Sequence, residues 1–584
     1  MENSKEIQIL QKLINPPRID INEQQLYYKY NGAGVVVEDG LIHIAAHTDV
    51  DFCTYFNSFS LEKWSEYTKA DDFYLSLKLR GAGIIRIYYA HLDGGTARKE
   101  EVESIAFSCE GNYFNFNLPN HNKGLIGFSI NAIDKPVDLL EAYYYSKCFD
   151  RRSLKIALAF TTYKREAYIT ENVQSILNYD DERLQIFVVD NGGTLQLPKH
   201  PRLKVFKNLN SGGAGGFSRN MLEIIQSSDK FTHVILMDDD VILDPNIFDR
   251  LFRFLSVLKE EYYDAFVGGA MFRCDHKAIH VESGAKWKGT VVWPFGNGLD
   301  MRRLDNLLQT NAIHQEDYNA WWFCCIPVNY IREDNLPLPL FFQWDDIDYG
   351  VRNKAPLILL NGLCLWHEPF EAKRSAMYTY YSTRNPLIVN CCHGGGYSKK
   401  QVLKELKRKI LSEICLYRYE HAEAVIKAME DFMKGSKWLC SINPDEYNKK
   451  ILSMNTAMEY VADQVDYQWY LVGNQIQDCD LLHHIVRVIT LNGYLLKANR
   501  EITVPLYADR PVQGYRATKI LFYEINSGMG FWATKDTKKA LKCIYRFFKL
   551  YFRISLSYKN IEKDYNENYS YMSSKEMWEK YLAI

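Results

Sequence analysis

The sequence lacks a strong net charge, a cysteine motif and a long apolar run. Its 70 basic and 72 acidic residues nearly cancel to a net charge of −2, so the chain has no basic field of the kind that nucleic-acid-binding proteins carry. The 13 cysteines contain no CxxC pair, which argues against a disulfide framework or a zinc site and favours a cytoplasmic protein with reduced thiols. No segment is long and apolar enough to span a bilayer, and the charged N-terminal segment lacks the apolar core of a secretory signal.

Three regions of different sequence pattern follow one another, and we predict domains at residues 1–150, 151–395 and 396–584. A chain of 584 residues is too long for one hydrophobic core. From about Leu26 to Tyr145, alternating and aromatic segments separated by glycine-containing turns predict short antiparallel strands in a β-sandwich or barrel. We expect this domain to serve packing or oligomerisation, with sugar binding as the alternative.

Strands and helices alternate after Arg151. The expected strands are LKIALAFTTYKR, LQIFVVDNGG, LKVFKNLNSGGAGG and THVILMDDD, and the expected helices are TENVQSILNY and GFSRNMLEIIQSS. This alternation predicts an α/β domain with a mostly parallel sheet. Ligands of such sheets lie beyond the carboxyl ends of the strands, so the polar endings TTYKR, DNGG and DDD mark the expected nucleotide site.

The region after about Cys392 has apolar residues at helical spacing, which predicts an α-helical domain. Within it, the segment from Thr537 to Lys559 mixes basic with aromatic residues. Two interpretations stay open, namely a helix that packs on its own domain and a membrane-surface helix that faces anionic lipid. In the second case the lipid-facing residues are Lys538, Lys539, Lys542, Arg546, Lys549 and Arg553.

Three consecutive carboxylates, Asp238 to Asp240, end one of the expected strands. Like charges this close repel, and a cation, a hydrogen-bonded turn or exposure to water compensates. Asp238 and Asp240 form a DxD pair that suits a hard divalent ion, although acidic triplets also cap turns and start helices. The later His367 is a natural third ligand beside such a pair.

Two further motifs, one rich in glycine and one acidic, are candidates for the functional site. The glycine-rich segment at residues 210–220, NSGGAGGFSRN, is neither a Walker loop nor a good GxGxxG fingerprint, and it indicates either a backbone close to a ligand or a flexible turn before a helix. The segment WDDIDYG presents Asp345, Asp346 and Asp348 after an aromatic stretch. A carboxylate that faces an acceptor hydroxyl is a natural general base.

Taken together, the motifs resemble those of inverting GT-A-fold glycosyltransferases, and in particular the bacterial galactofuranosyltransferases that build galactan. The resemblance runs from Leu154 to about Leu387 and rests on TYKR, DNG, NSGGAGGF, DDD, WW, WDDIDYG, WH and TRN. It implies an α/β, Rossmann-like GT-A catalytic domain between an N-terminal β-sandwich and a C-terminal α-helical domain. The segment from Thr54 to Trp64 also looks like the β-sandwich that these enzymes carry.

The resemblance also implies a role for individual residues. Asp346 would be the catalytic base, and Mn²⁺ or Mg²⁺ would be bound by Asp238, Asp240 and His367. The nucleotide of the donor would be bound by Arg165, Asp190, Asn191, Asn210, Asp238 and Asp239. The acceptor would contact Trp321, Trp322, Asp345 and Glu282.

The implied reaction transfers galactofuranose from UDP-galactofuranose, with inversion, to a glycan or lipid-linked acceptor in cell-surface polysaccharide synthesis. Another UDP-hexose donor stays open, because motifs in a nucleotide pocket do not read the sugar ring. A non-catalytic carbohydrate-binding scaffold is the alternative from a different class. We expect a cytoplasmic protein with peripheral contact to the inner face of the cell membrane and no nucleic-acid partner; homo-oligomerisation stays open.

Overall fold

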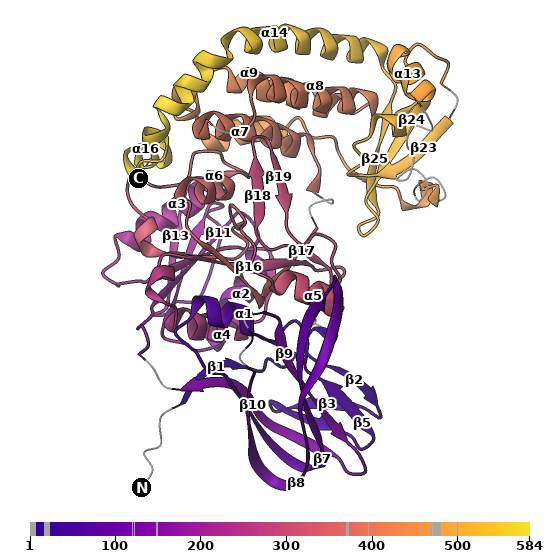
Figure 1. Ribbon diagram of the computed structural model, residues 1–584. Coiled ribbons are helices and arrows are strands. Elements are labelled where there is room, and N and C mark those ends of the chain that lie inside the picture. The colour runs from indigo at the N-terminus through magenta and orange to yellow at the C-terminus, as the bar shows by residue number, and fades with distance from the viewer. Residues whose placement is uncertain are drawn as a thin grey trace.

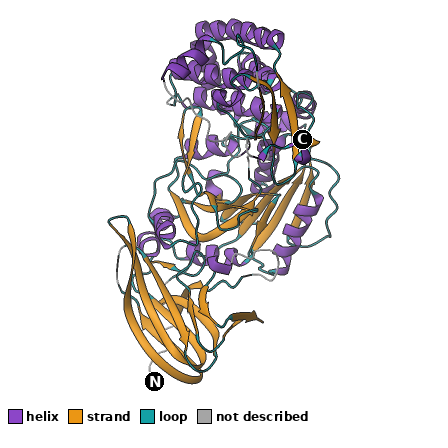
Figure 2. Cartoon of the chain, turned by 90° about the vertical axis from the view of Figure 1, so that its right-hand side faces the viewer, coloured by secondary structure: helices purple, strands orange, loops and turns teal. Residues whose placement is uncertain are grey.

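The computed structural model describes residues 7–16, 24–119, 121, 123–147, 150–369, 373–394, 396–467, 470, 481–498 and 500–583. Three regions follow one another along the molecule, with the β-rich N-terminal region at one end and a helical C-terminal region at the other (Figure 1). A second view shows the sheet of the central region between them, with the helices of the C-terminal region stacked above it (Figure 2).

The N-terminal region is one ten-stranded sheet in which every strand pair is antiparallel, as predicted. Its order is β2-β5-β9-β7-β10-β4-β3, with β1, β6 and β8 attached at the side. One short helix, α1 (Leu61–Tyr67), follows β6. The strands are β1 (Ile7–Lys12), β2 (Lys29–Gly32), β3 (Val35–Glu38), β4 (Leu41–Ile44), β5 (Thr48–Asp51), β6 (Phe59–Ser60), β7 (Tyr74–Asp93), β8 (Thr96–Asn117), β9 (Leu125–Ala132) and β10 (Val137–Lys147).

The prediction of short strands is wrong for β7 and β8, which have 20 and 22 residues and form one long hairpin (Figure 1). Glycines that suggest turns in the sequence lie inside β7 instead. A Cβ at Gly81 would lie 2.4 Å from the Pro136 carbonyl oxygen, and one at Gly83 would lie 2.3 Å from the Asn131 carbonyl oxygen. These glycines therefore permit close approach of neighbouring backbones rather than ending a strand.

The central region contains a nine-stranded sheet of order β13-β12-β11-β14-β20-β16-β21-β15, with β17 paired to β16. β13, β12, β11 and β14 are parallel neighbours, as the sequence predicts, whereas β20 runs antiparallel to both β14 and β16. The strands are β11 (Ile156–Thr162), β12 (Leu184–Asp190), β13 (Leu203–Lys207), β14 (His233–Asp238), β15 (Val241–Leu243), β16 (Phe266–Arg273), β17 (His280–Glu282), β20 (Cys324–Pro327) and β21 (Leu357–His367), and a separate hairpin joins β18 (Ala285–Lys288) and β19 (Val291–Pro294). The helices are α2 (Glu166–Asn178), α3 (Gly212–Ile225), α4 (Asn246–Ser256), α5 (Leu304–Asn311) and α6 (Asp345–Asn353).

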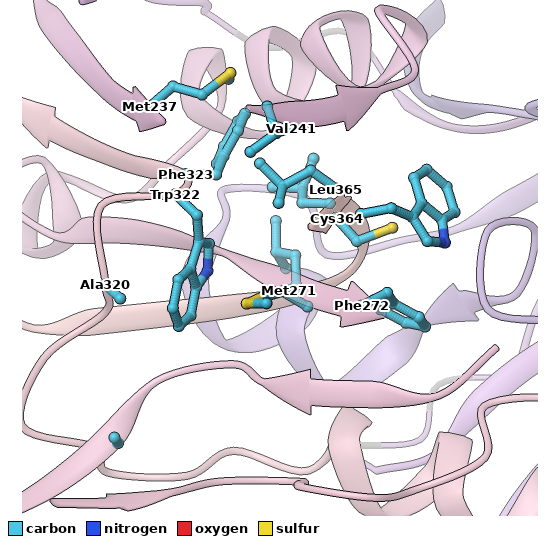
Figure 3. Close-up of a cluster of buried hydrophobic side chains, with 14 of the residues drawn as sticks. Met237, Val241, Met271, Phe272, Ala320, Trp322, Phe323, Cys364 and Leu365 are labelled. Atoms are coloured by element: carbon cyan, nitrogen blue, oxygen red, sulfur yellow. The ribbon is translucent and has the colours of Figure 1, made fainter. Parts of the chain in front are cut away.

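A buried apolar cluster fixes the strands that lead to the site (Figure 3). Met237 at the end of β14 lies in this cluster with Met271 of β16 and Leu365 of β21. Trp322 also belongs to it, and its indole nitrogen donates to the Gly269 carbonyl oxygen at 3.2 Å. The residues on the polar ends of β14 and β21 are therefore held by a rigid core.

The C-terminal region is largely helical, as predicted, but it also contains a four-stranded sheet of order β22-β25-β24-β23 that the sequence analysis does not anticipate. Among the described helices, none is long and apolar enough to cross a bilayer. The helices are α7 (Ala376–His393), α8 (Lys399–Cys415), α9 (Tyr419–Phe432), α10 (Ser436–Leu439), α11 (Pro444–Leu452), α13 (Leu481–Ile489), α14 (Thr537–Glu567), α15 (Tyr569–Met572) and α16 (Lys575–Leu582). The strands are β22 (Glu459–Tyr460), β23 (Arg500–Pro505), β24 (Ala517–Tyr523) and β25 (Met529–Thr534).

The basic and aromatic segment forms about the first three quarters of α14, which spans the top of the molecule in Figure 1. One face of the helix is buried against α7, α8 and α9, so the packing interpretation is correct for that face. Arg546 pairs with Glu423 and Glu430, and Lys539 pairs with Glu420, so these two predicted lipid-facing residues point toward α9 instead. The opposite face exposes Lys538, Lys542, Lys549 and Arg553 together with Leu541, Tyr545, Phe552 and Leu556.

Candidate active site

The carboxyl ends of β11, β12 and β14 meet at one edge of the sheet. Thr162 pairs with Asp190 across β11 and β12, and Thr161 pairs with Asp238 across β11 and β14. This register places Arg165, three residues beyond β11, next to the acidic triplet. Its Nη1 lies 3.2 Å from Asp239 Oδ1 and 2.5 Å from Asp240 Oδ2. The sequence thus correctly predicts that these strand ends form one polar site.

Asp238, Asp240 and His367 form a cluster that is able to hold a metal ion, because one ligand atom from each lies within 4.8 Å of the others. His367 Nε2 is 3.2 Å from Asp240 Oδ1. Burial and the neighbouring Asp240 raise the pKa of Asp238 to about 7. Burial alone would also raise the pKa of Asp240, but His367, Lys373 and Arg165 outweigh it and lower that pKa. Two carboxylates, one of them costly to ionise, and an imidazole make a donor set that a divalent ion would stabilise.

The three carboxylates of the WDDIDYG motif have different environments. Burial raises the pKa of Asp345 well above its usual range, and Asp346 adds to that effect. Burial also raises the pKa of Asp346, but only to about 6 because backbone N–H groups stabilise its charge. Asp348 is buried away from the pocket, and it accepts hydrogen bonds from His393 Nε2 at 2.9 Å and Tyr569 Oη at 2.7 Å. Asp346, whose pKa is about 6, therefore lines the pocket with Asp345, whereas Asp348 does not.

The loop before α6 has an unusual backbone that one asparagine supports. Phe341, Gln343 and Trp344 all have positive φ values, between 64° and 74°. Asn385 Nδ2 donates to the carbonyl oxygens of Leu340, Phe342 and Gln343 at 2.8 to 3.1 Å. Left-handed conformations cost of order 1–3 kcal/mol each in residues with side chains, so this loop depends on its hydrogen bonds. The TRN motif of α7 therefore sets the position at which α6 begins.

The glycine-rich segment is not the flexible turn that was one of its two interpretations, because α3 begins at Gly212. A Cβ on Gly212 would lie 1.8 Å from the Phe341 carbonyl oxygen, and one on Gly216 would lie 2.0 Å from Thr161 Cγ2. The glycines therefore let α3 pack closely on β11 and on the loop before α6. Close packing within the protein is the role that the structure gives to these two residues.

Two predicted nucleotide-binding residues are occupied by contacts within the protein. The Asp190 carboxylate accepts from the backbone N–H groups of Gly192, Gly193 and Leu195, and so it shapes its own loop. Asn191 Nδ2 donates to the Gly212 carbonyl oxygen at 3.0 Å. These bonds join the loop after β12 to the start of α3.

Asn210, another predicted nucleotide-binding residue, joins two regions of the chain. Asn210 Nδ2 lies 3.2 Å from Asp445 Oδ1 of α11, so this side of the site includes the C-terminal region.

A pocket of about 630 Å³ connects this edge of the sheet to the C-terminal helices. Asp238 and Asp346 both line it, as do the expected acceptor residues Trp321, Trp322, Asp345 and Glu282. Trp321 packs edge-on between Phe217 and Tyr349. Burial raises the pKa of Glu282 well above its usual range, and its Oε1 has no hydrogen-bond partner in the described residues. All of the expected acceptor residues thus lie in one cavity.

Two protein-family models match this chain. Residues 10–147 match a model described as galactofuranosyltransferase 2 N-terminal, and residues 154–325 match one described as glycosyltransferase like family 2. The second match contains β11 to β14, the acidic triplet and the Trp321–Trp322 pair. The central region is thus similar to family 2 glycosyltransferases, and its fold is of the GT-A type.

The chain is similar to two curated galactofuranosyltransferases named GlfT2. It is 27% identical to that of Mycolicibacterium smegmatis over 438 residues, which cover 69% of this chain and 66% of the relative. It is 26% identical to that of Mycobacterium tuberculosis over 437 residues, which cover 69% of this chain and 68% of the relative. The chain therefore spans about two thirds of the length of the relatives it matches.

Solved glycosyltransferases show weaker similarity to this GT-A chain. The mannosyltransferase PcManGT from Pyrobaculum calidifontis, in complex with GDP-Man and Mn²⁺, is 11% identical, with 59% of this chain and 87% of that one covered and a TM-score of 0.28. TarS residues 1–349 from S. aureus are 12% identical, with 47% and 81% covered and a TM-score of 0.29. Because these scores are low, the GT-A fold rests on the sheet described above and on the glycosyltransferase model.

Several residues of the site were not predicted from the sequence. Lys373 Nζ lies 3.0 Å from Asp240 Oδ2, and no local motif marks it. The end of the pocket against α8 contains Glu405, Arg408, Lys409 and Glu413, which look like an ordinary solvated helix face in the sequence. Their place at the pocket depends on the packing of α8 against α9 and α14, and a local sequence pattern does not report such packing.

Proposed function

We propose that the protein is an inverting, metal-dependent galactofuranosyltransferase. It transfers galactofuranose from UDP-galactofuranose to a glycan or lipid-linked acceptor in cell-surface polysaccharide synthesis. The observation that carries the proposal is that Asp238, a member of the cluster able to hold a metal ion, and the ionisable carboxylate of Asp346 line the same pocket. Displacement of a nucleoside diphosphate with inversion requires these two functions at separate positions.

The residues at the end of β14 suit a divalent cation, Mn²⁺ or Mg²⁺. Asp238, Asp240 and His367 would hold it, and the raised pKa of Asp238 shows how costly this pair is to ionise without a cation. The bound ion supplies charge neutralisation for the leaving diphosphate. Arg165 and Lys373 already contact Asp240 and add positive charge to the same place. The residues therefore fit the metal that the fold implies.

Asp346 acts on the acceptor in this proposal. Its carboxylate accepts the proton of the attacking hydroxyl as the hydroxyl oxygen bonds to the anomeric carbon of the donor sugar. Burial raises the pKa of Asp345, which favours its protonated form, and that form is able to donate a hydrogen bond in the same pocket. Glu282 and the indole rings of Trp321 and Trp322 then position the acceptor sugar.

The experiment that tests the proposal is a screen of purified UDP-sugars, with Mn²⁺ or Mg²⁺ and a galactofuranoside acceptor. We expect UDP release with UDP-galactofuranose, loss of activity in excess EDTA, and a product with inverted anomeric configuration by NMR. Turnover with UDP-galactopyranose or another UDP-hexose instead would refute the donor assignment. Absence of UDP release with every donor would favour the non-catalytic scaffold.

We further propose that the exposed face of α14 contacts an anionic membrane. Tyr545 is 70% exposed and Leu556 is 89% exposed, and both lie among basic residues such as Lys549 that form no ion pair in the described part of the chain. Such a segment contributes about 1 kcal/mol per Lys or Arg near an anionic surface, and salt weakens it. Vesicle co-sedimentation at low and high salt tests this, since equal binding at both would contradict an electrostatic contact.

A further inference from the structure

The two ends of the pocket differ in their charged side chains. The end at the sheet is lined by the carboxyl groups of Asp238, Glu282, Asp345 and Asp346 and, among the described residues, by no cationic side chain. The other end lies against α8, and the side chains there are Arg374, Glu405, Arg408, Lys409, Ser412, Glu413 and Asp509. A ligand that spans the pocket therefore meets carboxyl groups alone at one end, and both cations and carboxylates at the other.

Existing ion pairs at the α8 end use the two glutamates. Glu413 accepts from Arg374 Nη2 at 2.8 Å and from Arg418 Nε at 2.6 Å, and these cations outweigh the effect of burial and lower its pKa to about 2. Glu405 accepts from Arg408 Nε at 2.9 Å. The negative charge that these residues supply is thus already shared among three arginines.

Lys409 has no such partner. Its Nζ donates to the carbonyl oxygen of Ser382 at 2.8 Å and to the Ser382 hydroxyl at 3.1 Å, and it forms no ion pair with any residue that the structure describes. Burial, followed by repulsion from Arg374, lowers the pKa of Lys409 to about 7. Arg374 also has a buried Nε without an acceptor in the described residues. Both groups would be stabilised by an oxyanion, which accepts charge-assisted hydrogen bonds.

We propose that the α8 end of the pocket binds an oxyanion carried by the acceptor, with Lys409 and Arg374 as its ligands, while the acceptor hydroxyl lies at Asp346. This inference rests on the proposed transfer to a glycan acceptor and adds a chemical requirement for that acceptor. Lys409 and Arg374 at the α8 end attract the anion, whereas the described residues of the sheet end offer it no cation. The pocket therefore orients the acceptor as well as binding it.

The test uses three synthetic digalactofuranosides that have the same glycan and differ only in the aglycone. One has a neutral octyl group, the second an octyl phosphodiester and the third an octyl chain that ends in a carboxylate. We expect kcat/KM of the wild-type protein to be roughly tenfold higher for at least one anionic acceptor than for the neutral one, the gain typical of one hydrogen-bonded charge. Comparison of the two anionic acceptors shows whether phosphate or carboxylate is preferred.

Substitutions on α8 separate Lys409 from the general charge of the helix. Lys409→Met should lower the ratio of anionic to neutral kcat/KM several-fold, with Arg374 supplying what preference remains, whereas Lys409→Arg should retain the ratio because it keeps the charge. Lys404→Met is the matched control, because Lys404 is an exposed lysine of the same helix outside the pocket. Thermal melting of each variant identifies any that fails to fold, and then the Lys409→Arg ratio and the wild-type pH profile decide.

The pH dependence supplies a readout that a purely structural role would not change. The charged groups around Lys409 are Arg374, Arg408, Glu405 and Glu413. Lys409 is protonated below its pKa of about 7, so the preference for the phosphodiester, which does not titrate in this range, should decline above that pH. Equal kcat/KM for all three acceptors at every pH would overturn the inference and leave the proposed function intact.

Failure of the proposed function has a different signature. If none of the three acceptors is turned over, calorimetric binding of the phosphodiester acceptor still decides the inference. Weaker binding to Lys409→Met than to the wild-type protein would support the oxyanion site, and equal affinity would overturn it.

Discussion

Replacing Asp346 with asparagine should remove the proton acceptor and change little else in the site. The Asp346 Oδ1 atom accepts from the Ile347 backbone N–H at 2.8 Å, and an asparagine oxygen is able to make the same bond. Burial raises the pKa of the neighbouring Asp345 and so disfavours its ionised form, and Asp348 is bound to His393 and Tyr569, so we expect neither to replace the base. Loss of a general base costs about 10²–10⁴ in rate, and we expect Asp346→Asn to lose that much.

The assay separates chemistry from donor binding. Transfer is followed by UDP release, and UDP affinity is measured by calorimetry in the presence of Mn²⁺. Asp346→Asn should keep UDP affinity close to that of the wild-type protein, because the nucleotide contacts are expected at the ends of β11, β12 and β14.

The pH profile gives a second measurement of the base. The wild-type rate should fall about tenfold per pH unit below pH 6, since the pKa of Asp346 is about 6 and the base must be ionised. The variant should lose that limb of the profile.

Two outcomes would refute this reasoning. Wild-type transfer by Asp346→Asn would exclude it as the base, and loss of UDP binding would place it on the donor side of the site. Asp348→Asn is the matched control, because it changes a carboxylate two residues away in the same helix. That change should reduce the free energy of unfolding by about 2–4 kcal/mol, since it removes a buried charge that Arg352 and two hydrogen bonds stabilise, without a comparable loss of kcat in the folded protein.

Three further predictions concern other parts of the protein. Asp240→Asn should weaken Mn²⁺-dependent UDP binding as well as turnover, and unchanged calorimetric affinity would contradict its role as a ligand. Asn385→Ala removes three hydrogen bonds to the loop before α6 and should lower the free energy of unfolding, measured with denaturant, by about 2–4 kcal/mol. A decrease below about 0.5 kcal/mol would show that the loop keeps its conformation without these hydrogen bonds. Lys549→Glu combined with Arg553→Glu should reduce sedimentation with anionic vesicles by at least about tenfold, and unchanged sedimentation would exclude this face.

The membrane prediction is best tested by point substitutions, because the structure makes a deletion uninformative. α14 contributes four apolar or aromatic side chains to the core, namely Phe547, Leu550, Ile554 and Tyr558. Removal of residues 537–559 would therefore disrupt the packing of α7, α8 and α9 against α14. Exposed side chains can be changed without this cost.

Parts of the site that follow from strand periodicity were predictable from the sequence. Parallel strands that end in TTYKR and DDD must meet at one edge, and the structure places Arg165 against Asp240 there. His367 joins them because β15, which follows the triplet, pairs antiparallel with β21 and so places Val241 opposite His367. A local sequence pattern is sufficient to predict such a site where regular strand pairing brings the strand ends together.

Other parts depend on contacts that no local pattern reports. Asp348 looks equivalent to Asp346 in the sequence, but helix geometry turns it toward His393 and Tyr569, which follow 45 and 221 residues later. The glycines after Asn210 resemble a ligand-binding loop, yet Gly212 is required because α3 lies so close to the loop near residue 341 that a side chain would not fit. Likewise, the cations of α8 acquire a role only because α8 closes one end of the pocket.

The contact between Gly212 and Phe341 has a kinetic consequence. α3 begins beside the expected nucleotide site, and the Phe341 carbonyl belongs to the loop from which α6 and the base emerge. A Cβ placed on Gly212 would lie 1.8 Å from the Phe341 carbonyl oxygen, so α3 and the loop are in direct contact and α3 is unable to shift toward the loop without displacing it. A UDP-sugar bound at the start of α3 would therefore act on the loop that positions Asp346, and we expect the UDP-sugar to add before the glycan. Competitive inhibition by UDP against the sugar donor, with noncompetitive inhibition against the glycan, would support that sequence, and competitive inhibition against both would rule it out.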